Sequence, residues 1–326
     1  MSNLKEIQEF LAPHLERMNE FIKLNLNSDS SLMNSIVDNY LRRSGKQLRP
    51  IMVMLSASLK GQINDRVLYG AASIELLHNA SLIHDDVIDQ SRQRRGVDTI
   101  NHVWNNHVAV LVGDFFVSRA LICAVKSDTP MINVLADLGA DLSLGEVNQF
   151  DTARNHTITE QNYFSIITKK TASLFTSCVE VGALASGVEM TPGELEAIKQ
   201  YAHLLGLCFQ IKDDTFDYFN DTVVGKPTGN DLREGKITLP LIYALSREND
   251  PAQPQMRALV NKTLLSSDEI DTLISWTVES GGIDYAYRRM EELRTQASEL
   301  LSCEFDASPV TRMLDNIFAY IIERKM

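Results

Sequence analysis

Residues 68–89 read "LYGAASIELLHNASLIHDDVID" and predict a buried helix that ends in carboxylates. Apolar and small side chains fall on nearly every face of this stretch, which is typical of a helix at the centre of a helical protein. Asp85 and Asp89 are four residues apart and share one helix face, with Asp86 beside them. Ionised carboxylates in such surroundings are costly unless they are paired or bind a metal ion.

A second stretch, "YAHLLGLCFQIKDDTFDYF" at residues 201–219, repeats this arrangement with Asp213, Asp214 and Asp217. Carboxylate oxygens suit Mg²⁺, which usually shares its coordination shell with water and substrate phosphates. Two such helices could face one another and hold shared Mg²⁺ ions on a polyphosphate, which would make it a better leaving group. The paired motifs therefore favour metal-assisted polyphosphate chemistry.

Other interpretations of the acidic motifs are open at this point. One motif alone is compatible with a solvated acidic helix end. His84 and Asp85 could form the His-Asp pair of a phosphohydrolase, but such a site needs further His ligands and the sequence has no other His-Asp pair. An EF-hand is excluded, because neither motif has the D-x-D-x-D-G loop pattern.

Helical periodicity dominates the rest of the 326 residues. The stretch "LKEIQEFLAPHLERMNEFI" at residues 4–22 has apolar residues at three- or four-residue spacing: Leu4, Ile7, Leu11, Leu15, Met18 and Phe21. Residues 284–301 repeat the pattern, and runs that alternate like strands are scarce. We therefore predict an all-α protein of roughly a dozen helices in a single domain over residues 1–326.

One long loop is predicted at residues 220–240, "NDTVVGKPTGNDLREGKITLP". Its helix breakers are Gly225, Pro227, Gly229, Gly235 and Pro240. A loop of about 20 residues in a compact domain usually has a function.

Composition excludes several classes of protein. The net charge of −12 argues against nucleic acid as the main partner. The cysteines Cys123, Cys178, Cys208 and Cys303 form no CxxC pair, so neither a disulfide framework nor a zinc site is expected. Neither a signal peptide nor a membrane span is expected, which favours a cytoplasmic location.

Basic residues cluster beside the acidic motifs and beside turns. The segments are "SGKQLRP" with Lys46 and Arg49, "SRQRRGVDT" with Arg92, Arg94 and Arg95, "TKKTA" with Lys169 and Lys170, and the long loop with Lys226 and Lys236. A single lysine or arginine is usually a solvated surface residue. This placement instead favours binding of phosphate oxygens.

These segments together resemble the trans-isoprenyl diphosphate synthases, the family of farnesyl, geranylgeranyl and polyprenyl diphosphate synthases. "GKQLRP", "ELLHNASLIHDDVIDQSRQRRG", "LVGDF", "KKTASLF", "FQIKDDTFD" and "GKPTGNDLREGKITLP" occur in the family's order between residues 45 and 240. The resemblance implies the isoprenoid synthase fold, in which helices surround a deep active-site cavity. Two residues depart from the family's pattern. Ser44 stands where the family has the first Gly of GGK, and Asp98 stands where it has the Pro of RRGxPT. Both positions shape the backbone of a loop rather than bind a ligand.

The resemblance also implies a role for each matched residue. The implied Mg²⁺ ligands are Asp85, Asp86, Asp89, Asp213, Asp214 and Asp217. Lys46, Arg49, His78 and Arg95 would hold the diphosphate of isopentenyl diphosphate, and Arg94, Lys170 and Lys236 that of the allylic substrate. Thr171 and Gln210 would line the reacting centre, and Lys226 would close over the site with its loop. A buried core residue is the alternative for His78.

The implied reaction transfers an allylic group. Mg²⁺ and the cations draw the diphosphate from the allylic carbon, the isopentenyl double bond attacks the resulting cation, and the released diphosphate takes the proton. The protein supplies charge stabilisation, alignment and exclusion of water.

Small residues before the first acidic motif predict a long product. Ala80 and Ser81 stand where bulky aromatics would block the growing chain in short-chain members of the family, so we expect a product beyond C20. An octaprenyl-like enzyme that supplies quinone side chains is the first choice. Deeper candidates for the floor of the tunnel are Ile74 and Leu77, with Met131, Leu135 and Leu138 on a later helix. All of them could be ordinary core residues, and for the later helix that is the preferred interpretation.

Three rival functions stay open. A short-chain farnesyl or geranylgeranyl diphosphate synthase shares the chemistry, and a class I terpene cyclase shares the metal site but needs no second diphosphate. A non-catalytic partner subunit typically lacks one acidic motif, whereas both are intact here. The resemblance implies a homodimer, and the membrane-soluble product makes transient membrane contact plausible.

Overall fold

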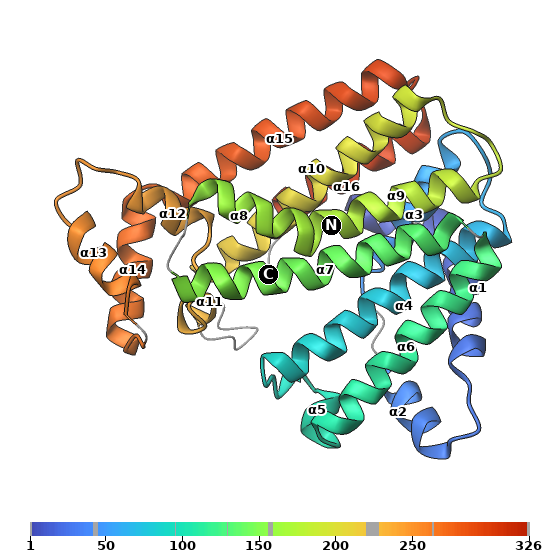
Figure 1. Ribbon diagram of the computed structural model, residues 1–326. Helices are drawn as coiled ribbons and strands as arrows, with labels where there is room; N and C mark the ends of the chain where they lie inside the picture. The colour runs from blue at the N-terminus through green and yellow to red at the C-terminus, as the bar shows by residue number, and fades with distance from the viewer. Residues whose placement is uncertain are drawn as a thin grey trace. The chain divides into compact units, whose positions relative to one another are not determined.

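The computed structural model of the chain describes residues 2–41, 45–94, 96–128, 130–155, 159–219, 228–262 and 264–324 (Figure 1). Helices dominate these ranges, which confirms the all-α prediction, and their only strands are the antiparallel pair β1 (Gln93–Arg94) and β2 (Val97–Asp98). The chain divides into two compact units, each of which is described by itself. The single domain over residues 1–326 stays a prediction.

The first unit comprises Met1–Ala140, Leu174–Lys199 and Glu304–Leu314. Its helices are α1 (Ser2–Leu26), α2 (Ser31–Leu41), α3 (Leu48–Ser58), α4 (Asp65–Ile88), α5 (Ile100–Val103) and α6 (Asn106–Ser127), with the first part of α7 (Pro130–Asn155), nearly all of α9 (Ser173–Ala185) and the start of α10 (Pro192–Phe216). The predicted stripe of α1 is buried at Leu4, Ile7, Leu11, Leu15 and Met18.

The predicted central helix is α4. It begins where the Asn64 side chain accepts a hydrogen bond from the backbone N–H of Val67, a capping contact that satisfies an otherwise unpaired donor. Its buried residues lie on all sides, as the sequence pattern predicts, and α6 runs beside it (Figure 1). The helix ends at Ile88, and Asp89 caps its C-terminus. The first acidic motif therefore stands at a helix end.

The helix α6 is long and apolar enough to cross a membrane, although no span was predicted from the sequence, and 39% of its most apolar window is buried. One helix of this kind is weak evidence for a membrane span, because core helices of water-soluble proteins meet the same criteria. Its outer face exposes Val110, Leu111, Leu121, Ile122 and Val125.

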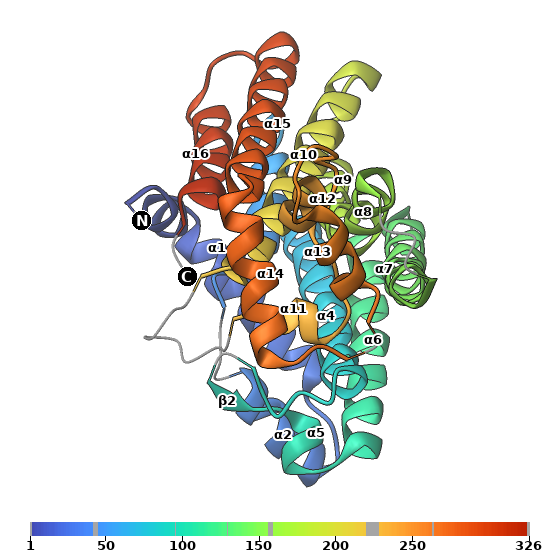
Figure 2. The same ribbon diagram turned by 90° about the vertical axis from the view of Figure 1, so that its left-hand side faces the viewer.

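The second unit comprises Asp141–Ser173, Gln200–Cys303 and Asp315–Met326. It holds the remainder of α7 and α10, α8 (Glu160–Ile167), the π-helix η1 (Thr168–Ala172), α11 (Asn230–Arg233), α12 (Leu239–Leu245), α13 (Gln253–Val260), α14 (Ser267–Glu279), nearly all of α15 (Gly282–Glu304) and the end of α16 (Pro309–Glu323). The three helices α12, α13 and α14 pack together (Figure 2).

The predicted long loop is partly helical. Residues 220–227, with Gly225, Lys226 and Pro227, lie outside the described residues. Gly229 and Gly235 have positive φ angles of 75° and 71° and flank the short helix α11, which interrupts the loop. Pro240 lies in the first turn of α12, so it begins a helix where the sequence predicted a break.

Candidate active site

The first acidic motif lies at the end of α4, in the first unit. Asp86 is buried and accepts a hydrogen bond from Arg94 Nε at 2.8 Å. Burial raises the pKa of Asp86, and the positive charge of Arg94 opposes that rise. Asp85 is half-buried and Asp89 is exposed. Asp86 is therefore paired with a cation of its own unit.

Hydrogen bonds in the turn after α4 direct Arg94 back toward Asp86. The Thr99 hydroxyl donates to the Ser91 carbonyl at 2.7 Å. Asn101 Nδ2 donates to the carbonyls of Asp86 and Ser91 at 3.1 and 3.0 Å. The strand β1, which carries Arg94, is thus tied to the helix end that carries the carboxylates.

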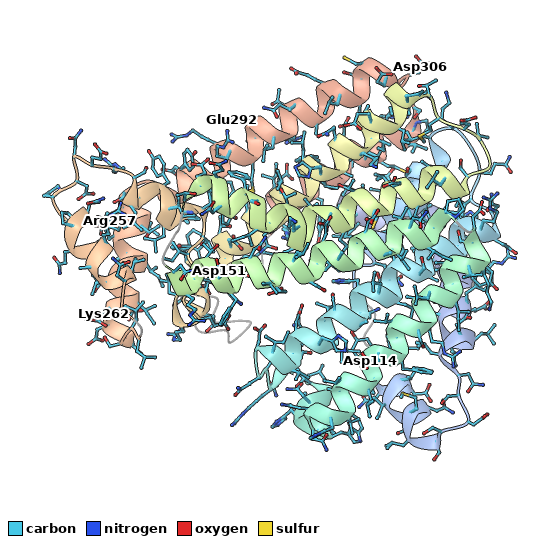
Figure 3. All side chains as sticks on the ribbon, viewed as in Figure 1. Asp114, Asp151, Arg257, Lys262, Glu292 and Asp306 are labelled. Carbon is cyan, nitrogen blue, oxygen red and sulfur yellow. The ribbon has the colours of Figure 1, made fainter. Side chains whose placement is uncertain are left out.

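His84 contacts α6. Its Nε2 lies 3.2 Å from the Val110 carbonyl and 3.6 Å from Asp114 Oδ1, and Figure 3 labels Asp114 on that helix. Gly113 leaves room for the imidazole, because a Cβ there would lie 2.2 Å from His84 Nε2. Since α6 occupies this ring nitrogen, the geometry does not favour His84 as the metal ligand of a phosphohydrolase.

The other predicted diphosphate cations of the first unit differ in exposure. Lys46 is exposed just before α3, and Arg49 is half-buried with its guanidinium 5.8 Å from the ring centre of Phe175. His78 is buried in α4. Arg95 lies outside the described residues. Their shared role in holding isopentenyl diphosphate stays a prediction.

The residues predicted to set product length divide into two groups. Ile74 and Ala80 are buried, whereas Leu77 and Ser81 are half-buried. Leu77 and Ser81 share a helix face with Asp85, at four-residue spacing. Ser81, rather than Ala80, therefore lies on the face of α4 that carries Asp85. The alternatives Met131, Leu135 and Leu138 are buried in α7, as ordinary core residues would be.

The second acidic motif lies at the end of α10, in the second unit. Asp213 accepts a hydrogen bond from Arg324 Nη2 at 2.6 Å. The Arg324 guanidinium lies 4.2 Å from the ring centre of Phe209 and 5.5 Å from that of Phe216, and it also donates to the Phe209 carbonyl. These contacts hold Arg324, the residue after α16, against the last turns of α10.

Asp217 connects the motif to the loop that follows it. Its two carboxylate oxygens accept hydrogen bonds from the backbone N–H groups of Asn230 and Asp231, at 2.9 and 3.0 Å, where α11 begins. Burial, and then the negative charge of Asp217, raise the pKa of Asp231 to about 6. Lys236 Nζ donates to Glu234 at 2.6 Å. Lys226 lies outside the described residues.

Asp214 is the end point of a chain of hydrogen bonds. Tyr163 donates to its Oδ2 at 2.6 Å and Gln210 Nε2 to its Oδ1 at 2.7 Å. Thr171 in turn donates to Gln210 Oε1 at 2.7 Å. Burial raises the pKa of Asp214 well above its usual range, with Asp231 adding to the rise and the two donors opposing it. The structure thus joins Thr171 and Gln210, both predicted at the reacting centre, to Asp214, which was predicted to bind metal.

Lys170 and Thr171 lie in the π-helix η1. The i→i+5 turn of η1 widens the helix after α8, a feature that occurs frequently at functional sites. Lys170 Nζ lies 2.5 Å from Glu146 and donates to Gln149 at 2.8 Å, both on α7. Gly145 allows this approach, since a Cβ there would lie 2.9 Å from the Lys170 backbone nitrogen.

The donors fit Mg²⁺ in kind. They are carboxylate oxygens, and Mg²⁺ typically binds one or two carboxylates together with water and phosphate. Within the part of the chain that the structure describes, no three acidic, histidine or cysteine side chains are grouped as a preformed metal site. Asp214 and Asp217 have both oxygens engaged by donors, whereas the contacts of Asp86 and Asp213 described above use one.

Sequence reasoning missed Tyr163, Arg324, Glu146 and Gln149. Tyr163 stands seven residues before Lys170, about two helical turns, a spacing that could have placed both on one helix face. Arg324 had no signal in the sequence, because it stands 111 residues from its partner Asp213.

Comparison with known proteins places this site in context. A family profile described as Polyprenyl synthetase matches residues 30–276. An all-trans-nonaprenyl-diphosphate synthase of Rhodobacter capsulatus is 36% identical over 302 residues, which cover 90% of this chain and 91% of that protein. An octaprenyl diphosphate synthase of Haemophilus influenzae is 33% identical over 306 residues, 92% of this chain and 91% of that protein.

A solved structure has the same fold. The crystal structure of a polyprenyl synthase from Caulobacter crescentus, complexed with calcium and isoprenyl diphosphate, superposes with a TM-score of 0.91. Its sequence is 29% identical, and the match covers 99% of this chain and 98% of that one.

Proposed function

The chain belongs to the polyprenyl synthetase family, and on that premise we propose that it joins isopentenyl diphosphate to an allylic diphosphate and makes a long-chain all-trans polyprenyl diphosphate. The observation that carries the proposal is the series of hydrogen bonds from Thr171 through Gln210 to Asp214, in the second acidic motif. These hydrogen bonds form a set of oriented dipoles, which suits a reaction through a cation. The similarity to octaprenyl and nonaprenyl synthases supports a long product.

Mg²⁺ is the proposed cofactor, and it would neutralise the diphosphate and make it a better leaving group. The residues proposed to hold it are Asp85, Asp86 and Asp89 in the first unit and Asp213, Asp214 and Asp217 in the second. Asp214 and Asp217 also accept hydrogen bonds that fix Gln210 and the start of α11, and each of their oxygens has a second lone pair.

Arg94 and Lys170 are proposed to bind the allylic diphosphate, together with Lys236. Before substrate arrives, carboxylates already hold them, Asp86 for Arg94 and Glu146 for Lys170. Such pairing orients each cation and limits the side-chain entropy that is lost on binding. Lys46, Arg49, His78 and Arg95 are proposed for isopentenyl diphosphate, and Lys226 for the closing loop.

The proposed reaction needs no nucleophilic side chain of the protein. The allylic C–O bond breaks and its electron pair leaves with the diphosphate. The isopentenyl double bond then forms the new C–C bond, and a proton passes to the released diphosphate. Thr171 and Gln210 would line this centre, where their role is to stabilise charge and exclude water.

A homodimer in the cytoplasm is proposed as the working form. The exposed apolar residues Val110, Leu111, Leu121, Ile122 and Val125 on α6 support this, because such a face is costly in water and a second copy could cover it. Light scattering tests it: Leu111→Glu should convert a dimer to a monomer. A wild-type protein that elutes as a monomer would contradict the proposal.

Product analysis tests the proposed function. Farnesyl diphosphate, labelled isopentenyl diphosphate and Mg²⁺ are incubated with the protein, and the dephosphorylated alcohols are resolved. We expect Mg²⁺-dependent products between C30 and C50 that are lost in Asp85→Asn, while Asp137→Asn, at an exposed carboxylate on α7, retains activity. Products that stop at C15 or C20 would refute the long chain alone. No elongation with any allylic primer would refute the function.

A further inference from the structure

Three hydrogen bonds in the second unit all run toward one carboxylate. Thr171 donates to Gln210 at 2.7 Å, Gln210 to Asp214 at 2.7 Å, and Tyr163 to Asp214 at 2.6 Å. Tyr163, Thr171 and Asp214 are 6%, 8% and 6% exposed, so little water competes for these groups. Thr171, Gln210 and Asp214 were predicted from the sequence as site residues, whereas Tyr163 was not.

The hydrogen bonds from Thr171 to Gln210 and from Gln210 to Asp214 are both donated in one direction, toward Asp214. Gln210 turns its NH₂ group toward Asp214, with Nε2 2.7 Å from the carboxyl oxygen Oδ1. Its carbonyl oxygen then faces Thr171, whose hydroxyl must donate. With its proton directed at Gln210, the Thr171 oxygen keeps its lone pairs for whatever lies on its other side. The position of the Asp214 carboxyl group therefore decides, through Gln210, how the Thr171 hydroxyl is oriented.

We propose that Tyr163 is a positioning residue for the transfer step, acting through Asp214 and Gln210 to point the Thr171 lone pairs at the allylic cation. This role rests on the proposed function, which puts Thr171 and Gln210 at the reacting centre. Tyr163 donates to the other oxygen of the same carboxyl group at 2.6 Å and so fixes the orientation of that group. Because the dipoles are oriented before substrate binds, they stabilise charge as it develops without first having to reorganise.

The test removes one hydroxyl. Tyr163→Phe keeps the ring and deletes the donor, and we expect kcat to fall about tenfold, as is typical when a supporting hydrogen bond is lost. The KM values for both substrates should stay within twofold, because Tyr163 is not proposed to touch either. The matched control is Tyr285→Phe. It deletes a hydroxyl of the same unit that donates to Glu160 at 2.9 Å and takes no part in the hydrogen bonds to Asp214. Its kcat should stay within twofold.

A double-mutant cycle separates positioning from general damage. Thr171→Val removes the group that Tyr163 is proposed to orient, so in that background Tyr163→Phe should change kcat less than twofold. If the two losses multiply, Tyr163 does not act through Thr171 and the proposal is overturned. If Tyr163→Phe does not fold, Asp214→Asn tests the same chain from its acceptor end and should show the same dependence on Thr171.

Thermal unfolding of the four proteins without substrate provides a second readout. Coupled Tm shifts support the hydrogen-bond chain, and additive shifts overturn it. If the wild-type protein elongates no primer, the proposed function fails, and the role of Tyr163 in transfer fails with it. The Tm values of the four proteins still decide whether the hydrogen bonds between Tyr163, Asp214, Gln210 and Thr171 are coupled. If Tm shifts are coupled but kcat losses multiply, the chain is structural and the positioning role is overturned.

Discussion

Replacing Gly145 by alanine should push the π-helix away from α7. An alanine Cβ at this position would lie 2.9 Å from the Lys170 backbone nitrogen, 3.1 Å from Lys170 Cα and 3.2 Å from Lys169 Cβ. Non-bonded carbon atoms pack at about 3.5–4.0 Å, so the backbone of η1 must retreat by roughly 0.5 Å. That movement would carry Lys170 and Thr171 with it.

The size of the effect follows from two opposing terms. Overpacking of this kind costs about 1–3 kcal/mol, whereas alanine in place of glycine within a helix gains about 1 kcal/mol. The net loss of stability is then about 1 kcal/mol, a Tm decrease of about 2 °C in a chain of this size. Since a misplacement of 1 Å can cost about 100-fold in rate, a shift of about half that should lower kcat about tenfold.

Gly139 offers a matched control in the same helix. A Cβ there has no atom within 4 Å, so Gly139→Ala gains helix propensity without a clash and should raise Tm slightly at unchanged kcat. Both variants are compared by scanning calorimetry and by elongation at saturating substrate. A Gly145→Ala protein with wild-type kcat and a Tm that rises like that of Gly139→Ala would refute the close approach of α7 and η1.

Three further outcomes are expected. Arg324→Gln removes the partner of Asp213 and should cost about 1–2 kcal/mol, seen as a lower Tm; an unchanged Tm would mean that the pair adds no stability. Ser81→Phe should shorten the product to C15 or C20 in the chromatographic assay, and unchanged length would place the barrier elsewhere. Glu194 has its pKa lowered, chiefly by the hydrogen bond from Lys60, so its ionised form contributes stability that is lost as pH falls through the folded-state pKa. Glu194→Gln should therefore lower Tm at pH 7, and the difference between the two Tm values should shrink as pH falls below the ordinary glutamate pKa of about 4.3; a difference that stays constant down to the lowest pH at which both proteins fold would contradict this.

Local features of the sequence predicted the helices well. The stripe of α1 and the all-round burial of α4 follow from the spacing of apolar residues, which depends only on neighbours along the chain. The positions of Asp85 and Asp213 near helix ends were predicted in the same way. Pro240 was misread, because the same residue type stops one helix and is favoured in the first turn of the next.

The sequence treated the six aspartates as equivalent. Their spacing is the same in both motifs, so nothing local separates Asp213, which pairs with Arg324, from Asp214, which ends the chain from Thr171. Burial and long-range partners make the difference, since a carboxylate's pKa and bonding depend on the groups that fold against it.

By itself, the sequence determined that the chain is helical, that carboxylates stand at two helix ends, and which family it resembles. Only the tertiary structure decided which donor each carboxylate receives. Tyr163 stands 51 residues from Asp214, and Arg324 stands 111 residues from Asp213. Periodicity and motif spacing report on residues within a few helical turns, whereas contacts across such distances exist only once the helices have packed and excluded water between them.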